Sequence, residues 1–336
     1  MGELPSRRHR SDSRFSVILF VIKGYCDCRM LRVTWQNREA ESTGMNRSHK
    51  FRYFLWALTQ GQRSDRSCPS CTSLKVGIVR RKFLVTALLE CQNCGLRFRF
   101  PKDTDTRSRH FYQGDYEQGF TTDLPSDGQL KEMLACRFKN TVKDYQTYIA
   151  VLQAIGVEPG STILDFGCSW GYGSWQLQEA GFKVYSYEVN KNRAEFARRK
   201  LRCSIVGEDL VSDRIDCLFS AHVLEHLTDP NLLWRIAERV LSPNGVVVCF
   251  LPNGDSRLEA EYGTRQYHQL WGQVHPLLVG PGAAVFMAKR HAYIPVVHTS
   301  PYDLQLLRAN TPSDHLFGQE LLLIARKAIH GGSKLS

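Results

Sequence analysis

Long apolar runs are scarce in this 336-residue chain, and their scarcity limits the classes of protein it can belong to. The run at 15–22 is far shorter than the roughly 20 residues that a membrane-spanning helix needs. It follows an arginine-rich start, but no small-residue cleavage site comes after it. We therefore expect neither a membrane segment nor a secretory signal, and we predict a cytoplasmic protein.

Acidic residues are few in the first third of the chain. Residues 1–110 carry 22 Lys and Arg against 9 Asp and Glu, whereas residues 111–336 carry 22 against 24. A basic segment of this kind is typical either of a protein with an acidic or nucleic-acid partner or of a solvated extension. Because residues 1–60 show no sustained hydrophobic period, we predict a basic, disordered extension there, and Met45 could be the true start.

Cysteine is not scarce, and four of the eleven cysteines form two CxxC pairs. These are Cys68-Pro-Ser-Cys71 and Cys91-Gln-Asn-Cys94, with nineteen residues between them. This spacing presents four thiolates to one tetrahedral Zn²⁺, and because no coordination position is left open, the zinc would be structural. We predict a zinc ribbon over 64–100, with strands at 75–79 and 82–89, and a linker over 101–130. Other cysteines inside predicted strands indicate a reduced, intracellular protein.

The GxGxxG fingerprint of dinucleotide-binding proteins is missing from the glycine-rich loop of this chain. The loop holds Gly167, Gly171 and Gly173 within a strand, loop, helix and strand that span 162–190. Asp165 ends the first strand and Glu188 ends the second, so both acids lie where parallel sheets bind ligands. An acid ahead of the loop would repel a pyrophosphate, which disfavours NAD. Glu188 is placed to accept hydrogen bonds from the hydroxyls of a ribose.

This stretch resembles the class I S-adenosylmethionine-dependent methyltransferases, and the resemblance covers about 131–327. It implies that the loop marked by Asp165 and the three glycines wraps the methionine half of S-adenosylmethionine, and that Glu188 holds the ribose. Ser169 stands where the family often has a glycine. The loop must therefore adopt a conformation that a residue with a Cβ tolerates.

The remaining pattern alternates strands and helices as this fold requires. We predict one helix over 131–155 and further strands at 203–206, 216–220, 246–250, 296–299 and 321–325. Glu208 or Asp209, after the third strand, could receive the adenine amino group. The predicted fold class is α/β, with a doubly wound, Rossmann-like methyltransferase sheet over 131–328 preceded by the small zinc ribbon.

Two histidine-bearing segments are candidates for the chemistry. His222, Glu225 and His226 would share one helical face beside the methyl donor, and we take His222 both as a cofactor-binding residue and as the first candidate base. The segment resembles the ExxEH stretch of quinone O-methyltransferases, which is associated with a divalent metal. His222 replaces the first acid here, so the segment would bind a hard metal ion less well. Glu225 and His226 could instead simply order the turn. His275 is a second candidate base.

We predict methyl transfer from S-adenosylmethionine to a small-molecule or glycan-precursor acceptor. The arrangement resembles bacterial methyltransferases of sugar, polysaccharide or secondary-metabolite pathways. The first alternative is an RNA methyltransferase of the rRNA type, because some of these also begin with a four-cysteine zinc module. The chain has no NPPY-like tetrad to grip a base amino group, which disfavours nucleic acid as the partner. The second alternative is a catalytically silent, zinc-dependent scaffold, against which intact Asp165 and Glu188 argue.

Overall fold

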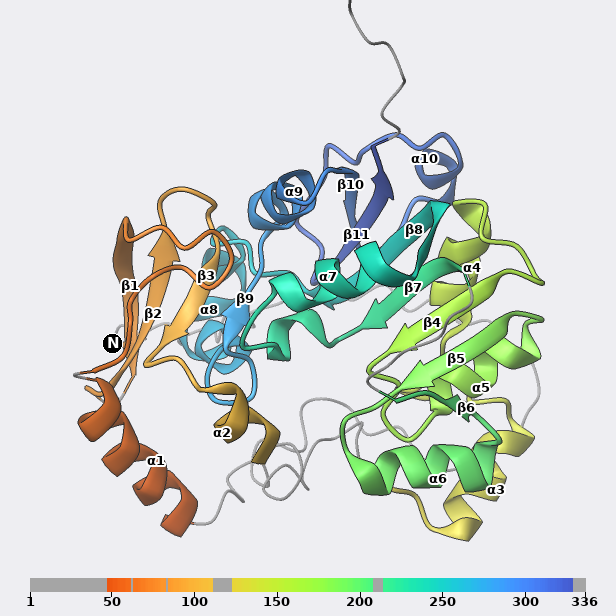
Figure 1. Ribbon diagram of the computed structural model, residues 1–336, viewed down its shortest axis with the longest axis horizontal. Coiled ribbons are helices and arrows are strands. Elements are labelled where there is room, and N and C mark those ends of the chain that lie inside the picture. Colours follow the sequence, from red (N-terminus) through yellow and green to blue (C-terminus); the bar gives the residue numbers. More distant parts are fainter. Residues whose placement is uncertain (1–46, 62, 83, 111–122, 208–213, 329–336) are drawn as a thin grey trace, which may run out of the picture. The chain divides into compact units, whose positions relative to one another are not determined.

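The computed structural model describes residues 47–61, 63–82, 84–110, 123–207 and 214–328. All of these belong to one compact unit, Met45–Ser336. Residues 1–46, which make up most of the predicted basic extension, lie outside the described residues, as do Glu208 and Asp209. The described chain forms one sheet of seven strands and one of four (Figure 1).

The larger sheet has the strand order β10-β11-β8-β7-β4-β5-β6. Its strands are β4 (Thr162–Phe166), β5 (Lys183–Tyr187), β6 (Ser204–Ile205), β7 (Ile215–Ala221), β8 (Leu241–Pro252), β10 (Tyr293–Thr299) and β11 (Glu320–Lys327). Neighbours are parallel except at β11, which runs antiparallel to both β8 and β10. The chain leaves β4 toward β5 on one side and returns to β7 on the other, so the carboxyl ends of β4 and β7 lie at the switch point of the sheet. The predicted doubly wound α/β sheet is confirmed.

Both faces of this sheet are buried, which is why its central strands are continuous apolar runs rather than alternating ones. Along β4, Leu164 packs in one apolar cluster and Ile163 in the other. Helices α7 (Asn231–Val240) and α9 (Pro281–Arg290) contribute to the first cluster. Helices α4 (Gln146–Ala154), α5 (Tyr172–Glu179) and α10 (Leu304–Arg308) contribute to the second. The α6 helix (Lys191–Leu201) packs with the loop tryptophan Trp170 in a third, smaller cluster.

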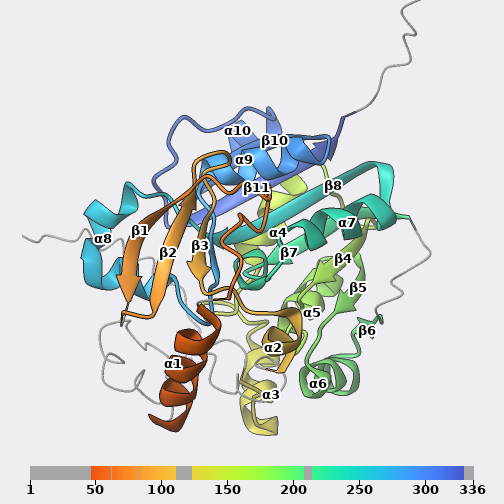
Figure 2. The ribbon, with the colours of Figure 1, turned by 60° about the vertical axis from the view of Figure 1, so that its left-hand side comes forward.

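The smaller sheet has the order β1-β2-β3-β9, and all its neighbours are antiparallel. Figure 2 shows β1, β2 and β3 side by side. Its strands β1 (Val76–Lys82), β2 (Thr86–Cys91) and β3 (Arg97–Phe100) come from the cysteine-rich segment, whereas β9 (Leu277–Leu278) comes from much later in the chain. The buried cysteines of this segment belong to the same apolar cluster as α7 and α9. The segment predicted as a separate zinc ribbon is therefore packed into the same compact unit as the large sheet.

The helices ahead of the large sheet differ from the sequence-based expectation. The predicted helix over 131–155 is two helices, α3 (Asp127–Ala135) and α4. The break occurs because Arg137, Phe138 and Asn140 have positive φ angles, and the turn buries Phe138 against Trp170. A capping box at Ser126 starts α3 inside the predicted linker, where α2 (Asp105–His110) also lies.

The end of the predicted disordered extension differs from that expectation, because residues 47–61 form the helix α1 (Arg47–Gly61). Its Tyr53 hydroxyl lies 3.1 Å from the Thr86 hydroxyl of β2 and accepts a 2.8 Å hydrogen bond from Arg99 of β3. Tertiary contacts, rather than a hydrophobic period, thus order this helix. Among the described residues, every helix is too short or too polar to span a bilayer.

Candidate functional site

The glycine-rich loop between β4 and α5 has a backbone that few residue types can adopt. Gly167, Ser169 and Gly171 have φ angles of +91°, +52° and +90°. Ser169 therefore takes a left-handed conformation that costs a residue with a Cβ some strain, as the sequence required. The amides of Gly167 and Cys168 both donate to the Tyr187 carbonyl of β5, which ties the loop to the neighbouring strand end.

Space, as well as φ, requires glycine in this loop. A Cβ at Gly167 would lie 2.3 Å from a methyl carbon of Val223, and one at Gly173 would lie 2.4 Å from the ring of Tyr145. At Gly171 it would lie 2.8 Å from the Cys203 sulfur. The loop is thus pressed against both neighbouring strand ends, and its contact with Val223 joins it to the segment that follows β7.

Asp165 ends β4 inside the protein, with 2% of its surface exposed. Its Oδ2 accepts a 2.6 Å hydrogen bond from Ser174 of α5, and Ser174 in turn accepts one from Ser186 of β5. Burial raises the pKa of Asp165 to about 7, and the charge of Glu188 adds to this effect. A cation next to this carboxyl would favour its ionised form.

Glu188, which follows β5, uses both carboxylate oxygens to hold the loop in place. One oxygen accepts a 3.0 Å hydrogen bond from the Ser169 amide, and the other accepts a 2.7 Å bond from the Asn190 amide. Burial raises the pKa of Glu188, and these amides oppose the shift. A carboxylate offers about four lone-pair sites, so Glu188 can also accept hydrogen bonds from a diol.

A polar cluster lies at the carboxyl end of β7 around His222, whose φ angle is +56°. Its Nε2 lies 2.7 Å from Oε1 of Glu320, the first residue of β11, and its Nδ1 lies 3.5 Å from Oε1 of Glu225. Tyr148 of α4 and Tyr302 each donate a 2.6 Å hydrogen bond to Glu320. Because β11 is antiparallel, its first residue reaches the same edge as the carboxyl ends of the parallel strands.

The proton on His222 is held tightly by this cluster. Burial opposes the positive charge, but the nearby carboxylates of Glu225 and Glu320 raise the pKa of His222 to about 10. The pKa of Glu320 is lowered, because the histidine and the two tyrosines outweigh its burial. His222 is therefore an imidazolium at neutral pH, and this environment does not favour the hypothesis that it acts as a base.

A second group of side chains also lies next to Glu225, which belongs to the short 3-10 helix η3 (Leu224–His226). His226 and His275 have ring centroids 4.7 Å apart, and Nε2 of His226 lies 4.0 Å from Oε1 of Glu225. His275 belongs to the segment between η4 (His268–Leu270) and β9. Burial lowers the pKa of His275 to about 4, so its ring is neutral.

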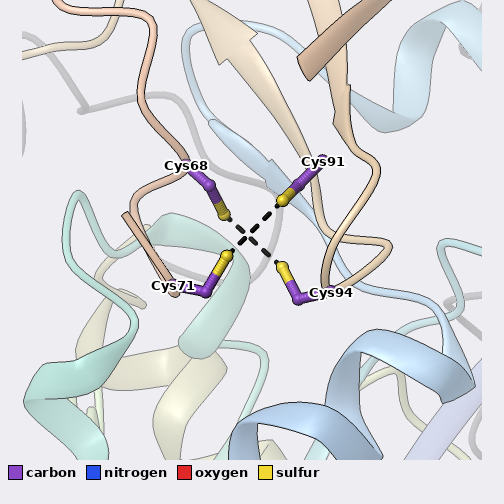
Figure 3. A group of neighbouring side chains, drawn as sticks. All are labelled: Cys68, Cys71, Cys91 and Cys94. Atoms are coloured by element: carbon purple, nitrogen blue, oxygen red, sulfur yellow. Dashed lines mark hydrogen bonds between the residues drawn. The ribbon is translucent and has the colours of Figure 1, made fainter. Parts of the chain in front are cut away.

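The four cysteines of the CxxC pairs come together at one point (Figure 3). All are buried, and their sulfur atoms lie within 4.8 Å of one another, with 3.5 Å between Cys68 and Cys94 and between Cys71 and Cys91. The two turns are alike, because the Thr72 and Gly95 amides bond back to the first cysteine of each pair at positive φ. A Zn–S bond of about 2.3 Å gives tetrahedral S···S separations of roughly 3.8 Å, so the donor set fits Zn²⁺.

The predicted site residues thus separate into three places. The loop acids and glycines lie at the ends of β4 and β5. His222 and His275 each lie near Glu225. The four cysteines lie at the turns of the small sheet. Glu320, Tyr148 and Tyr302 were missed. Their sequence signal was weak, because they come from three segments and only Glu320, an acid at the start of an apolar strand, departs from its local pattern.

Comparison with known proteins gives a family match for part of this unit. Residues 164–249 match the family model described as a methyltransferase domain. This segment runs from β4 to β8 and includes the glycine-rich loop, Glu188 and η3. The match agrees with the resemblance to methyltransferases that the sequence predicted.

Two curated proteins and one solved structure illustrate how distant the relatives are. An uncharacterised 37.1 kDa protein in a transposon of Streptomyces fradiae is 28% identical over 41% of this chain and 42% of its own length. The ribosomal RNA small subunit methyltransferase A of Lactobacillus acidophilus is 23% identical over 39% of this chain and 52% of its own. The chain thus spans about half the length of these relatives. The magnesium protoporphyrin IX methyltransferase of Synechocystis is 14% identical over 67% of this chain and all of that chain, with a TM-score of 0.44.

Proposed function

We propose that this chain transfers a methyl group from S-adenosylmethionine to a small-molecule or glycan-precursor acceptor. The observation that supports this most strongly is the loop between β4 and α5, whose three glycines have no room for a Cβ and which lies between the buried Asp165 and the half-buried Glu188. S-adenosylmethionine, when bound, supplies an electrophilic methyl on a sulfonium. Asp165 would favour the ammonium of the methionine half, and Glu188 the ribose hydroxyls.

The charges at the end of β7 suit an acceptor with polar groups. His222, as an imidazolium held by Glu320, places a positive charge beside the acceptor and so favours a polar or anionic group there. His275 is neutral and can accept a proton, but a pKa of about 4 makes it a weak base at neutral pH. The residues closest to the acceptor thus provide positioning rather than a strong base.

We also propose one structural Zn²⁺ per chain, held by Cys68, Cys71, Cys91 and Cys94. All four sites in its tetrahedron would be sulfur, so no position is open for a substrate. The ion would cross-link the two CxxC turns of the small sheet.

Replacing Glu188 tests the cofactor assignment. Each lost hydrogen bond to a charged acceptor is worth about 1.5 to 3 kcal/mol, so Glu188→Ala should weaken binding of S-adenosylhomocysteine by about tenfold or more. Glu158→Ala changes an exposed acid of the loop before β4 and should bind normally. Calorimetry that gives equal affinities for wild type and Glu188→Ala would reject the assignment.

An RNA acceptor is the alternative, and the basic first third of the chain together with the rRNA methyltransferase among the relatives favours testing it. RNA held through 6 to 10 phosphate contacts would lose roughly 10³ to 10⁵ in affinity between about 50 and 200 mM salt, because counterions are released. We expect weak, salt-sensitive binding that disappears when residues 1–46 are deleted. Radiolabelled methyl transfer into RNA but not into small molecules by the truncated protein would reverse our preference.

A further inference from the structure

Glu225 is an acid whose burial needs a counter-charge. Only 2% of its surface is exposed, and neither carboxylate oxygen makes a hydrogen bond with any residue that the structure describes. Its nearest cationic partner is Nδ1 of His222 at 3.5 Å, which is beyond good hydrogen-bonding distance. The His222 imidazolium therefore supplies a positive charge beside Glu225, but both carboxylate oxygens still lack a hydrogen-bond donor. They remain available as ligand atoms for a bound group.

Two imidazoles present lone pairs beside this carboxylate. Nδ1 of His226 lies 2.7 Å from the Val274 carbonyl, and Nδ1 of His275 lies 3.3 Å from the Leu270 carbonyl. A carbonyl oxygen only accepts hydrogen bonds, so Nδ1 carries the proton in each ring and the lone pair is on Nε2. Histidines that bind metals are commonly held in this way, by a backbone carbonyl on the other nitrogen.

The three side chains also converge. One ligand atom from each of Glu225, His226 and His275 lies within 4.8 Å of the other two. Metal–ligand bonds of about 2.0 to 2.2 Å place ligand atoms roughly 3 to 3.5 Å apart, so a small inward rotation completes the geometry. Glu225 and His226 share η3, whereas His275 reaches them from the segment before β9.

We propose that Glu225, His226 and His275 form a binding site for a divalent transition metal ion with open coordination positions. Two imidazoles and one carboxylate suit Zn²⁺, Fe²⁺ or Co²⁺ better than Mg²⁺ or Ca²⁺. The ligand set is not the one that the ExxEH resemblance implies. His222 is excluded because its two nitrogens face Glu320 and Glu225, and His275 provides the third ligand instead.

The position of this site indicates the acceptor class, and this step rests on the proposed methyltransferase function. Val223, next to η3, touches the cofactor loop at Gly167. Three protein ligands leave positions for oxygen ligands from the acceptor. An acceptor with a hydroxyl or carboxylate oxygen would thus be held beside the methyl donor, where the chain offers no strong base.

Cobalt binding tests the site directly. Co²⁺ is added to protein that already holds one Zn²⁺ per chain, because thiolates keep Zn²⁺ in preference to Co²⁺. We expect one Co²⁺ per chain by equilibrium dialysis and elemental analysis, and at least about tenfold weaker binding by His275→Gln. The matched control is His268→Gln, which changes a histidine of the same segment that is not part of the cluster. Absence of bound Co²⁺ in the native protein, or equal binding by His275→Gln, would overturn the proposal.

Thermal unfolding of Glu225→Gln provides a second measurement. Without Co²⁺, this variant should be less stable than the native protein, because it removes the carboxylate that faces the His222 imidazolium, so each protein serves as its own metal-free reference. Co²⁺ should raise the Tm of the native protein and leave that of Glu225→Gln unchanged, whereas an equal rise in both would contradict the site. S-adenosylhomocysteine binding is measured separately on the same samples. Protein that binds Co²⁺ but not S-adenosylhomocysteine would overturn the proposed function and support the metal site.

Discussion

The carboxyl of Asp165 gives the cofactor site a pH dependence. Burial raises its pKa to about 7, so ligand-free protein keeps a proton there in mild acid. If an ammonium group binds the ionised form, the pKa in the complex is lower and binding releases the proton. Affinity for S-adenosylhomocysteine should then fall by up to about tenfold per pH unit below pH 7 and level off above it.

Calorimetry from about pH 5.5 to about 8.5 measures this dependence. Asp165→Asn should bind more weakly at high pH and show a flatter profile. This variant separates the effect of Asp165 from that of Glu188, whose pKa is also raised by burial. A profile for Asp165→Asn that keeps the wild-type slope would assign the dependence to another group.

At the residue scale, the sequence predicted which residues lie at the site better than it predicted their charges and contacts. The positions of Asp165 and Glu188 follow from their place after apolar runs, and both lie at strand ends as expected. The charge state of His222 did not follow, because it depends on Glu320, which lies 98 positions away along the chain. The group formed by Glu225, His226 and His275 contains His275 but not His222, and this too depends on tertiary contacts.

In the turn from β4 to α5, one added methyl group should destabilise the protein. Gly167→Ala would place a Cβ 2.3 Å from Val223 at a φ of +91°. We expect a loss of about 1 to 3 kcal/mol in the free energy of unfolding, together with weaker S-adenosylhomocysteine binding. Denaturant titration measures the first effect and calorimetry the second.

Two further variants separate the effect of the steric clash from the effect of the backbone conformation. Gly282→Ala in α9 has open space around the new Cβ and an ordinary φ, so it should be neutral or slightly stabilising. Gly167→Ala combined with Val223→Ala should recover part of the loss if the clash, rather than φ alone, causes it. No recovery in the double variant would assign the loss to the backbone.

At the element scale, the strands were easier to predict than the helices. Fully buried parallel strands such as β7 and β8 are short apolar runs between turn residues, and both occur close to the predicted ranges. No glycine or proline marks the break between α3 and α4 in the sequence. The break places Phe138 in the protein interior. Strand β9 has only two residues and was not predicted, since a run this short carries no period.

For the whole molecule, removal of the zinc ligands should affect more than the small sheet. Cys91→Ser/Cys94→Ser should hold no zinc by elemental analysis, against one per chain in the native protein, and its free energy of unfolding should fall. S-adenosylhomocysteine binding should persist, because the loop residues lie in the other sheet. Native protein purified without chelator that contains no zinc would contradict the zinc proposal.

The same variant should lose Co²⁺ binding at the histidine cluster. The Arg99 amide of β3 donates a 2.7 Å hydrogen bond to the carbonyl of Pro276, the residue after His275. Strand β9 follows directly and pairs with β3. If β3 loses its order, His275 loses its anchor, and intact Co²⁺ binding in the zinc-free variant would show that the two sites are independent.

The pairing of β3 with β9 also sets an order of events during synthesis. Phe98 pairs with Leu277, so the edge of β3 leaves the ribosome roughly 180 residues before its partner, which at about 5–20 residues per second is on the order of ten seconds or more. During that interval the nascent chain can load its zinc while a strand edge stays open to other chains. The alternation of Arg97 and Arg99 along β3 places charges on that edge, which is how natural sheets keep a waiting strand from pairing with a neighbouring nascent chain.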